Sequence, residues 1–382
     1  MSGILTTAHR VMFVAGGLCA LGVVAWTSWG DSGAPVATPL AGSGIWHLHE
    51  MLFGFAAAGF AGYTLTAMAS WTGGRLPGPF AIGVLAGLWV VARLAAFGAL
   101  GESLWLALPA ALGFTIWVAL LLAREAVLCR VPRGLVQAGF ALLLVVLQGA
   151  IWLGEVAAAP PVLGFALLLS AVGGRMVASF TRNRLEHQPG EDARFRFAEH
   201  CGTVGVLCIA LAFGVEVWLG AWTWQGGALL LIAAVAETLR LAAWQDRAVR
   251  REGLLAMLHL GYLWLPLGLG LMGALYLELL DGFAPDLLHA LTAGAIACLI
   301  WAVAARAEAR RADRLRATWL SLVGFALLWL SALARVAQEV LPLAGQLSPW
   351  LWCLAWVLFL IAHLRTWASP APRPVFSGKR RA

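Results

Sequence analysis

Long apolar blocks recur along this chain, and each is long enough to cross a lipid bilayer as a helix. The hydrocarbon core is about 30 Å thick, so a spanning helix needs about 20 predominantly apolar residues. Twelve such blocks lie at roughly 9–29, 46–70, 80–98, 103–123, 134–152, 161–181, 199–219, 222–243, 253–277, 285–305, 317–341 and 347–368. The sequence therefore predicts an all-α fold, a polytopic membrane helix bundle of about twelve transmembrane helices.

Composition excludes a fold that is soluble in water. Of the 382 residues, 61% are apolar and 12% are charged, whereas soluble domains carry about a quarter charged residues. The net charge of +7 could suggest a nucleic-acid partner. The basic residues, however, stand in short Arg-rich runs between apolar blocks, which is typical of loops that face anionic lipid. We therefore expect the lipid bilayer as partner and no nucleic acid.

Positive charge is concentrated in alternate loops. Runs of Arg follow the fourth, sixth, eighth and tenth blocks, and basic residues Lys379, Arg380 and Arg381 lie near the end of the chain. The opposite loops are acidic and hold essentially no Lys or Arg; they carry Asp31, Glu102, Glu155, Asp281 and Asp286. The positive-inside rule then predicts that both termini are cytoplasmic.

No soluble domain is evident, and no internal repeat. We expect one integral-membrane domain over 1–382, with helices 1–6 at about 9–181, a cytoplasmic loop at about 182–198, helices 7–12 at about 199–368 and a basic cytoplasmic tail at 369–382. The first block resembles a signal peptide, and the stretch 34–37 offers small residues for cleavage. The even number of blocks favours a retained helix instead.

Ionisable residues inside the apolar blocks are the first functional candidates, because each costs about 2.5–3.5 kcal/mol at mid-membrane. The second block opens with His47, His49, Glu50 and Met51. At about 100° per residue, His47, Glu50 and Met51 share one side of a helix, and His49 faces the other way. In the predicted orientation, this periplasmic level also holds Arg93, His289, Arg335 and Glu339.

A second, cytoplasmic level holds imidazoles and arginines as well. His259 lies about six residues, or roughly 9 Å, inside this face, while His200 and His363 lie near the interface. Arg175 follows two glycines, which allow close helix approach, so its side chain could meet phosphate, carboxylate or propionate. Lipid anchoring is the alternative for Arg175.

These residue types suit haem and copper. Neutral imidazole binds haem iron and copper, and a thioether adds preference for Cu(I). A buried Arg pairs with carboxylates such as haem propionates through two parallel bonds. The alternative is that each His bonds a backbone carbonyl and that Arg335 and Glu339 form an intrahelical ion pair. The six cysteines form no CxxC motif, and single buried thiols are the simplest interpretation.

The run from Trp46 to Phe55, WHLHEMLFGF, resembles the hallmark of the NnrS family. Other segments resemble the family in the same order: Gly174-Arg175-Met176, Ser179-Phe180-Thr181-Arg182-Asn183, Arg240 with Trp244, His259-Leu260-Gly261-Tyr262, and His289-Ala290-Leu291-Thr292. The resemblance implies a twelve-helix protein of the bacterial inner membrane that contains haem and copper. It also implies a role in nitric oxide metabolism and protection against nitrosative stress.

The resemblance points to four histidines as metal-site imidazoles: His47, His49, His259 and His289. Within this set we predict His49 and His289 as haem ligands, with Arg93 and Arg335 near propionates, and His47 with Met51 toward copper; His259 and Arg175 are further cofactor-binding candidates. After the tenth helix the family usually shows Gly-His-Thr-Gly-Arg, whereas residues 305–314 here contain no His.

Three classes of function remain open at this point. The favoured one is a haem- and copper-binding protein that handles nitric oxide or small iron-nitrosyl species. The second is a secondary transporter with a buried His, Arg and Glu path for substrate or protons. The third, an oxidase or reductase with a three-His copper centre beside a haem, is disfavoured because only three His lie at the periplasmic level. The sequence does not decide whether the protein is an enzyme.

Overall fold

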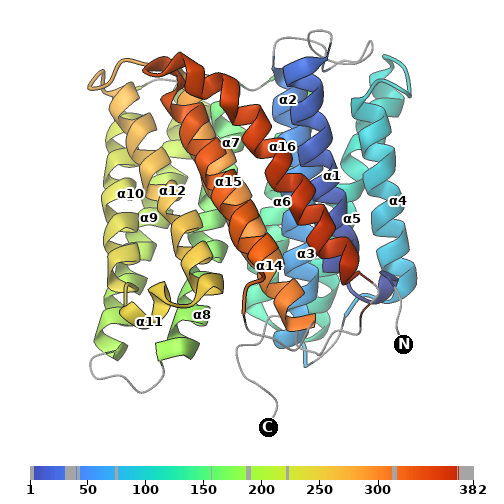
Figure 1. Cartoon of the computed structure of the whole chain (residues 1–382). Coiled ribbons are helices and arrows are strands. Elements are labelled where there is room, and N and C mark those ends of the chain that lie inside the picture. The colour runs from blue at the N-terminus through green and yellow to red at the C-terminus, as the bar shows by residue number, and fades with distance from the viewer. Residues whose placement is uncertain are drawn as a thin grey trace. The chain divides into compact units, whose positions relative to one another are not determined.

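The computed structural model describes residues 4–30, 40, 44–73, 76–155, 157–185, 191–220, 223–311, 316–367 and 369. Throughout these residues the chain forms helices and connecting turns, with no strand (Figure 1). The predicted all-α fold is therefore confirmed. Three predictions concern residues outside the described part, namely Asp31, the stretch 34–37 and the basic residues near the end of the tail.

Sixteen α-helices make up most of the described chain. They are α1 (Ala8–Trp29), α2 (Ile45–His49), α3 (Ala57–Ala67), α4 (Pro79–Ala96), α5 (Leu104–Leu128), α6 (Pro132–Trp152), α7 (Ala159–Leu168), α8 (Gly174–Leu185), α9 (Glu191–Leu219), α10 (Trp224–Ala243), α11 (Arg247–Arg250), α12 (Gly253–Tyr276), α13 (Ala284–His289), α14 (Ala297–Arg311), α15 (Trp319–Val336) and α16 (Pro342–Arg365). Short 3₁₀ turns lie at Ile4–Thr6, Met68–Ser70 and Ala337–Glu339.

Twelve spans in the described residues are long and apolar enough to cross a membrane. Nine are single helices or a helix with a short 3₁₀ turn, and the other three join two α-helices through a π-helical segment. The predicted number of spans is confirmed. The predicted side of the membrane for the termini and the single-domain organisation stay predictions.

The sequence fixes several helix ends directly. Pro79 and Pro132 stand in the first turn of α4 and α6, where a missing N–H breaks no intrahelical bond. The hydroxyls of Thr223 and Thr318 accept backbone N–H bonds at the starts of α10 and α15. These residues mark helix starts in a chain whose apolar blocks contain few other residues that favour a helix end.

The predicted loop at 182–198 is helical wherever the structure describes it. Helix α8 continues to Leu185, and α9 begins at Glu191 rather than near residue 199. The acidic pair Glu191 and Asp192 opens α9, where negative charge suits the helix dipole, and Arg182 pairs with both. Polar helix ends therefore extend beyond the apolar blocks that predicted the spans.

Three spans contain a π-helical segment: η2 (Glu50–Ala56), η4 (Leu169–Gly173) and η5 (Ala290–Ile296). A π-helical turn shifts the backbone register and leaves carbonyl groups that the helix itself does not fully satisfy. Side chains from other spans bond such carbonyls here. The Trp89 Nε1–H donates to the Gly54 carbonyl at 2.9 Å, and the Arg240 Nη1–H donates to the Ser170 carbonyl at 2.9 Å. Hydrocarbon offers no water for this task, so the protein supplies the donors.

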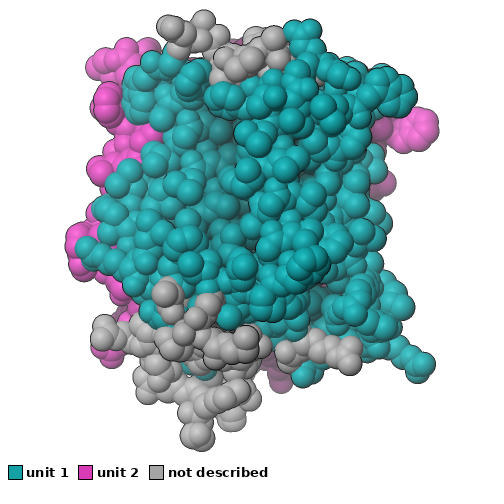
Figure 2. Space-filling model, turned by 90° about the vertical axis from the view of Figure 1, so that its right-hand side faces the viewer, with its two compact units in different colours: residues 1–158, 306–315, 356–377 teal, residues 159–305, 316–355, 378–382 magenta. Residues whose placement is uncertain are grey.

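The chain divides into two compact units (Figure 2). Unit 1 comprises residues 1–158, 306–315 and 356–377, and within it α1 packs against α3 and η2 while α5 packs against α4 and α6. Unit 2 comprises residues 159–305, 316–355 and 378–382, and within it α10 packs against α9 and α12, and α12 packs against η5. Each unit has its own set of buried polar side chains.

Within unit 2, the approach of α12 to η5 depends on Gly268. A Cβ atom at this position would lie 2.6 Å from Leu291 Cδ2 and 3.1 Å from the Leu291 backbone nitrogen. Gly270, on the same helix, is a natural control, because its nearest neighbour to an added Cβ would be Ala234 Cβ at 3.7 Å.

We predict that Gly268→Ala lowers the free energy of unfolding by about 1–3 kcal/mol, because the added methyl group forces α12 and η5 apart. Gly270→Ala should leave stability unchanged or raise it by up to about 1 kcal/mol, since alanine favours the helix. Thermal unfolding of both variants in the same detergent measures the difference. Equal stability of the two variants would contradict the close approach.

Candidate functional site

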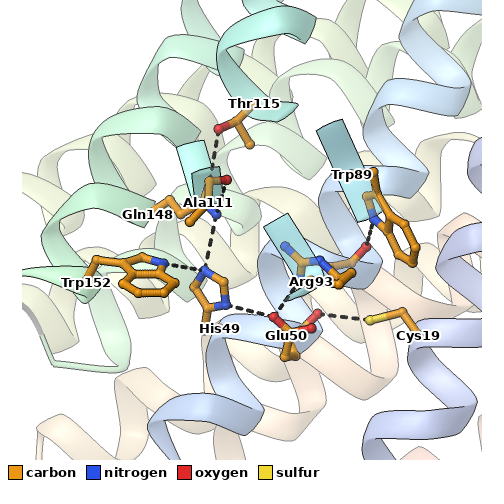
Figure 3. A network of polar contacts seen from close by, with 10 residues as sticks. Cys19, His49, Glu50, Trp89, Arg93, Ala111, Thr115, Gln148 and Trp152 are labelled. Atoms are coloured by element: carbon orange, nitrogen blue, oxygen red, sulfur yellow. Dashed lines mark hydrogen bonds and ion pairs between the residues drawn. The ribbon is translucent and has the colours of Figure 1, made fainter. Parts of the chain in front are cut away.

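The best-defined polar site of unit 1 centres on His49, at the end of α2 (Figure 3). The ring is fully buried, and both its nitrogens are bonded. Nδ1 lies 3.0 Å from Glu50 Oε1, and Nε2 accepts the indole N–H of Trp152 at 3.0 Å. Because Nε2 accepts, the proton of the neutral ring is on Nδ1 and is donated to the carboxylate.

Gln148 of α6 is the second group that faces His49 Nε2 (Figure 3). Its side-chain Nε2 lies 3.2 Å from the imidazole nitrogen and also donates to the Ala111 carbonyl at 3.1 Å. Its Oε1 accepts the Thr115 hydroxyl at 2.9 Å, which fixes the orientation of the amide. The imidazole nitrogen that could bind a metal is therefore covered by two N–H donors, both from α6.

Glu50 is the first residue of η2 and joins His49 to Arg93 (Figure 3). Arg93 Nη1 of α4 lies 2.6 Å from Glu50 Oε1, and the guanidinium carbon lies 5.7 Å from the centre of the Trp89 ring. Arg93 Nε and Nη2 are buried and have no hydrogen-bond partner among the described residues. The ion pair neutralises the charge, while one edge of the guanidinium is left without an acceptor.

Sequence periodicity assigned Glu50 to the wrong side of its helix. The predicted shared side of His47, Glu50 and Met51 is divided in the structure: His47 and Met51 are half-buried, whereas Glu50 is buried and contacts His49. His47 Nδ1 lies 3.4 Å from the Thr27 hydroxyl of α1. The π-helical segment begins at Glu50, so a regular 100° step does not describe this turn.

His259, on α12 of unit 2, is held by protein groups through both ring nitrogens. Its Nε2 lies 2.8 Å from the Thr181 hydroxyl, and its Nδ1 lies 3.0 Å from the Gln245 amide nitrogen. The Thr181 hydroxyl donates its proton to the Val177 carbonyl, so it accepts from His259. This complete set of bonds is what a buried neutral imidazole needs in a helix bundle.

A buried cluster in unit 2 was not predicted from the sequence, apart from Arg240 itself. Glu237 of α10 is fully buried and accepts the hydroxyls of Ser170 and Tyr262, the latter at 2.6 Å. Arg240, one turn later, donates from Nη1 to Tyr262 Oη and to the Ser170 carbonyl, both at 2.9 Å, and lies 3.3 Å from Glu237 Oε2. An acidic residue three positions before Arg240 within an apolar block was the available signal.

His289 and Arg335 belong to unit 2, and Arg335 pairs with Asp286 and not with Glu339, its partner in the alternative interpretation. Arg335 Nη2 lies 3.0 Å from the buried Asp286 and also donates to Gln338. Glu339 instead accepts the backbone N–H of Phe283, so the intrahelical Arg335–Glu339 pair is wrong. The ring of His289 is half-buried, and its Nδ1 lies 2.6 Å from the Pro285 carbonyl.

Of the predicted site residues, His49 and Arg93 are brought together in unit 1 by their shared partner Glu50. Arg175 is exposed on α8. Among the described residues, no three His, Cys, Asp or Glu side chains form a group that could hold a metal ion, and all six cysteines are free. The segment that lacks the family's histidine continues α14 as far as Arg311.

Fold and contacts together define a helical, multi-pass membrane protein with a buried imidazole–carboxylate–guanidinium site. The family described as NnrS protein matches residues 3–370, which is nearly the whole chain. The chain therefore belongs to the NnrS family, which is linked to the nitric oxide response, and the resemblance found in the sequence is confirmed. No curated protein matches the chain.

We predict that Glu50→Gln destabilises the protein by about 3–5 kcal/mol, because it leaves the Arg93 charge buried without a counter-charge. The double variant Glu50→Gln/Arg93→Met should be more stable than Glu50→Gln alone, since it removes the orphaned charge as well. Thermal unfolding in detergent measures both effects.

Arg182→Met is the matched control for this experiment. Arg182 also pairs with carboxylates, but its side chain is 46% exposed, so its loss should cost no more than about 1 kcal/mol. If Glu50→Gln behaves like Arg182→Met, the buried ion pair does not stabilise unit 1.

Proposed function

We propose that this protein binds haem and copper in the bacterial inner membrane and handles nitric oxide or small iron-nitrosyl species. Membership of the NnrS family supports the link to nitric oxide. The observation that carries the haem assignment is the buried His49, whose Nδ1–H is donated to Glu50. Histidines that bind metals almost always donate the other ring N–H in this way, which fixes the tautomer and raises ligand basicity.

His49 fits a metal ligand in tautomer and in its carboxylate partner. Nε2 is the nitrogen whose lone pair points away from Glu50, and it accepts from Trp152 and Gln148. Both donors are uncharged side chains of α6, so binding a metal would exchange two N–H···N bonds for one coordination bond. Neither donor is charged, and Gln148 keeps its bonds to Thr115 and the Ala111 carbonyl, so the exchange would leave no buried charge.

Arg93 fits a carboxylate ligand such as a haem propionate. Its Nη1 is occupied by Glu50, whereas Nε and Nη2 form the guanidinium edge that binds a carboxylate with two parallel bonds. Leaving these buried N–H groups unbonded is costly, and an acceptor from a bound group would remove the cost. His289 and Arg335 of unit 2 remain further candidates, with Arg335 already engaged by Asp286.

The copper assignment rests on His47 and Met51. They stand four residues apart on the half-buried side of the same span and offer an imidazole and a thioether, a donor set that suits Cu(I). Bound haem iron and copper supply coordination positions at which nitric oxide can bind. The chain's own residues hold those groups, orient them and keep water away from the buried side.

We predict that the protein, purified from haem-replete cells, shows a Soret band and contains iron. His49→Ala should lose most of the band, because no other described residue occupies its position between Glu50 and Trp152. His200→Ala is the control, because His200 is exposed and bonds only within its own helix to the Arg196 carbonyl. Absorption spectra and iron content per chain measure the effect.

The haem proposal is tested first on the wild-type protein, by its absorption spectrum and iron content. Absence of any Soret band and of iron would remove the haem assignment. Metal-independent uptake of a solute into vesicles by the same protein would then favour the transporter alternative.

Copper content is tested separately. We predict that Met51→Leu and His47→Ala each weaken copper affinity at least about tenfold and so lower the copper content per chain. The Soret band should remain, because both donors lie on the side of the helix opposite His49. Met68→Leu is a matched control, since Met68 is fully buried at the other end of the same span. Equal copper content in all three variants and wild type would contradict the assignment.

A further inference from the structure

The three π-helical segments lie at equivalent places along the chain. When the twelve spans are taken in groups of four, the second span of each group contains a π-helical segment, and no other span does in the described residues. These spans are 45–70, 159–185 and 284–310, with similar lengths of 26, 27 and 27 residues. This order indicates three repeats of four helices, which the sequence alone did not reveal.

A common residue spacing supports the equivalence. The α-helix before each π-helical segment ends at His49, Leu168 or His289, and a glycine follows five residues later, at Gly54, Gly173 and Gly294. The imidazole positions of the first and third repeats therefore correspond to each other. In the second repeat, leucine takes the place of the imidazole.

A carboxylate–arginine pair accompanies each segment. The pairs are Glu50 with Arg93 at 2.6 Å, Glu237 with Arg240 at 3.3 Å, and Asp286 with Arg335 at 3.0 Å. In the first and third repeats the acid belongs to the π-containing span and the arginine to the next span. In the second repeat both belong to α10 and reach the segment through Ser170, whose carbonyl and hydroxyl they bond.

The backbone packs closely around the second pair, Glu237 and Arg240. Added Cβ atoms at Gly174 and Gly202 would overlap the Arg240 guanidinium, and one at Gly205 would overlap the Glu237 carboxylate. These glycines leave little room for a ligand around the guanidinium, whose Nε has no hydrogen-bond partner among the described residues. The contact of Arg240 with the Ser170 carbonyl instead satisfies a backbone group of η4 that has no water available in the membrane.

We propose that Glu237 and Arg240 are positioning residues that hold η4 in place, as the counterparts in the second repeat of Glu50–Arg93 and Asp286–Arg335. A carboxylate–arginine pair recurs in each repeat, at positions that differ between the repeats, whereas an imidazole ends the preceding α-helix in two of the three. In the second repeat, the task of the pair is therefore separate from the binding of a metal group, which rests on the proposed function. The second repeat, with Leu168 at the position of the imidazole, has the π-helical segment and the pair but no histidine there.

Amide hydrogen exchange of the full-length protein in detergent tests this assignment. Arg240→Met should speed exchange about tenfold or more in residues 169–180, because the η4 carbonyl loses its donor and Glu237 its counter-charge. Haem content should stay at the wild-type level. Arg93→Met should speed exchange in residues 50–60 and also change the haem spectrum. Arg182→Met, at an exposed pair, is the control.

Tyr262→Phe provides a milder variant if Arg240→Met does not fold. It removes the hydroxyl that donates to Glu237 and accepts from Arg240, without changing charge. We expect it to speed exchange about threefold in the same residues. Arg240→Lys should restore part of the protection.

Two outcomes would overturn the positioning role. One is faster exchange spread evenly over the chain or equal to that of Arg182→Met. The other is loss of haem in Arg240→Met as complete as in His49→Ala. A wild-type protein without haem would end the proposed function, while the exchange pattern would still decide the role of Glu237 and Arg240.

Discussion

Hydrocarbon provides no water to hydrogen-bond a polar group, and this constraint organises the interior of the protein. A polar atom placed there needs a partner from the chain itself or from a bound group. Glu50 and Glu237 each meet an arginine, and the carbonyls of Gly54 and Ser170 meet side chains from other spans. The buried networks of both units follow from this single requirement.

The same constraint makes a buried N–H group without an acceptor an indication of a bound ligand. Arg93 uses one nitrogen for Glu50, while Nε and Nη2 are buried without a partner in the described part of the chain. Such an edge is costly unless something else binds it, so it supports a carboxylate ligand near His49. His259 differs from His49 in its ring partners, which are the uncharged side chains of Thr181 and Gln245 instead of a carboxylate.

Histidines that looked alike in the sequence therefore differ in the structure. His47, His49, His259 and His289 were all candidates because an imidazole inside an apolar block is unusual. Depth and residue type could not tell them apart, since the difference lies in what each ring contacts. The carboxylate beside His49 was visible in the sequence, but Trp152 and Gln148 come from α6, about a hundred residues away, and no local pattern connects them to it.

The sequence by itself determined the class of fold and the family. Twelve apolar blocks are a property of composition along the chain, and bilayer thickness converts them into spans without any tertiary information. Tertiary structure alone decided the π-helical segments, the side on which Glu50 lies, the partner of Arg335 and the cluster around Glu237. These features depend on contacts between spans. Hydropathy does not show which spans are in contact, because lipid and a neighbouring helix are equally apolar surroundings.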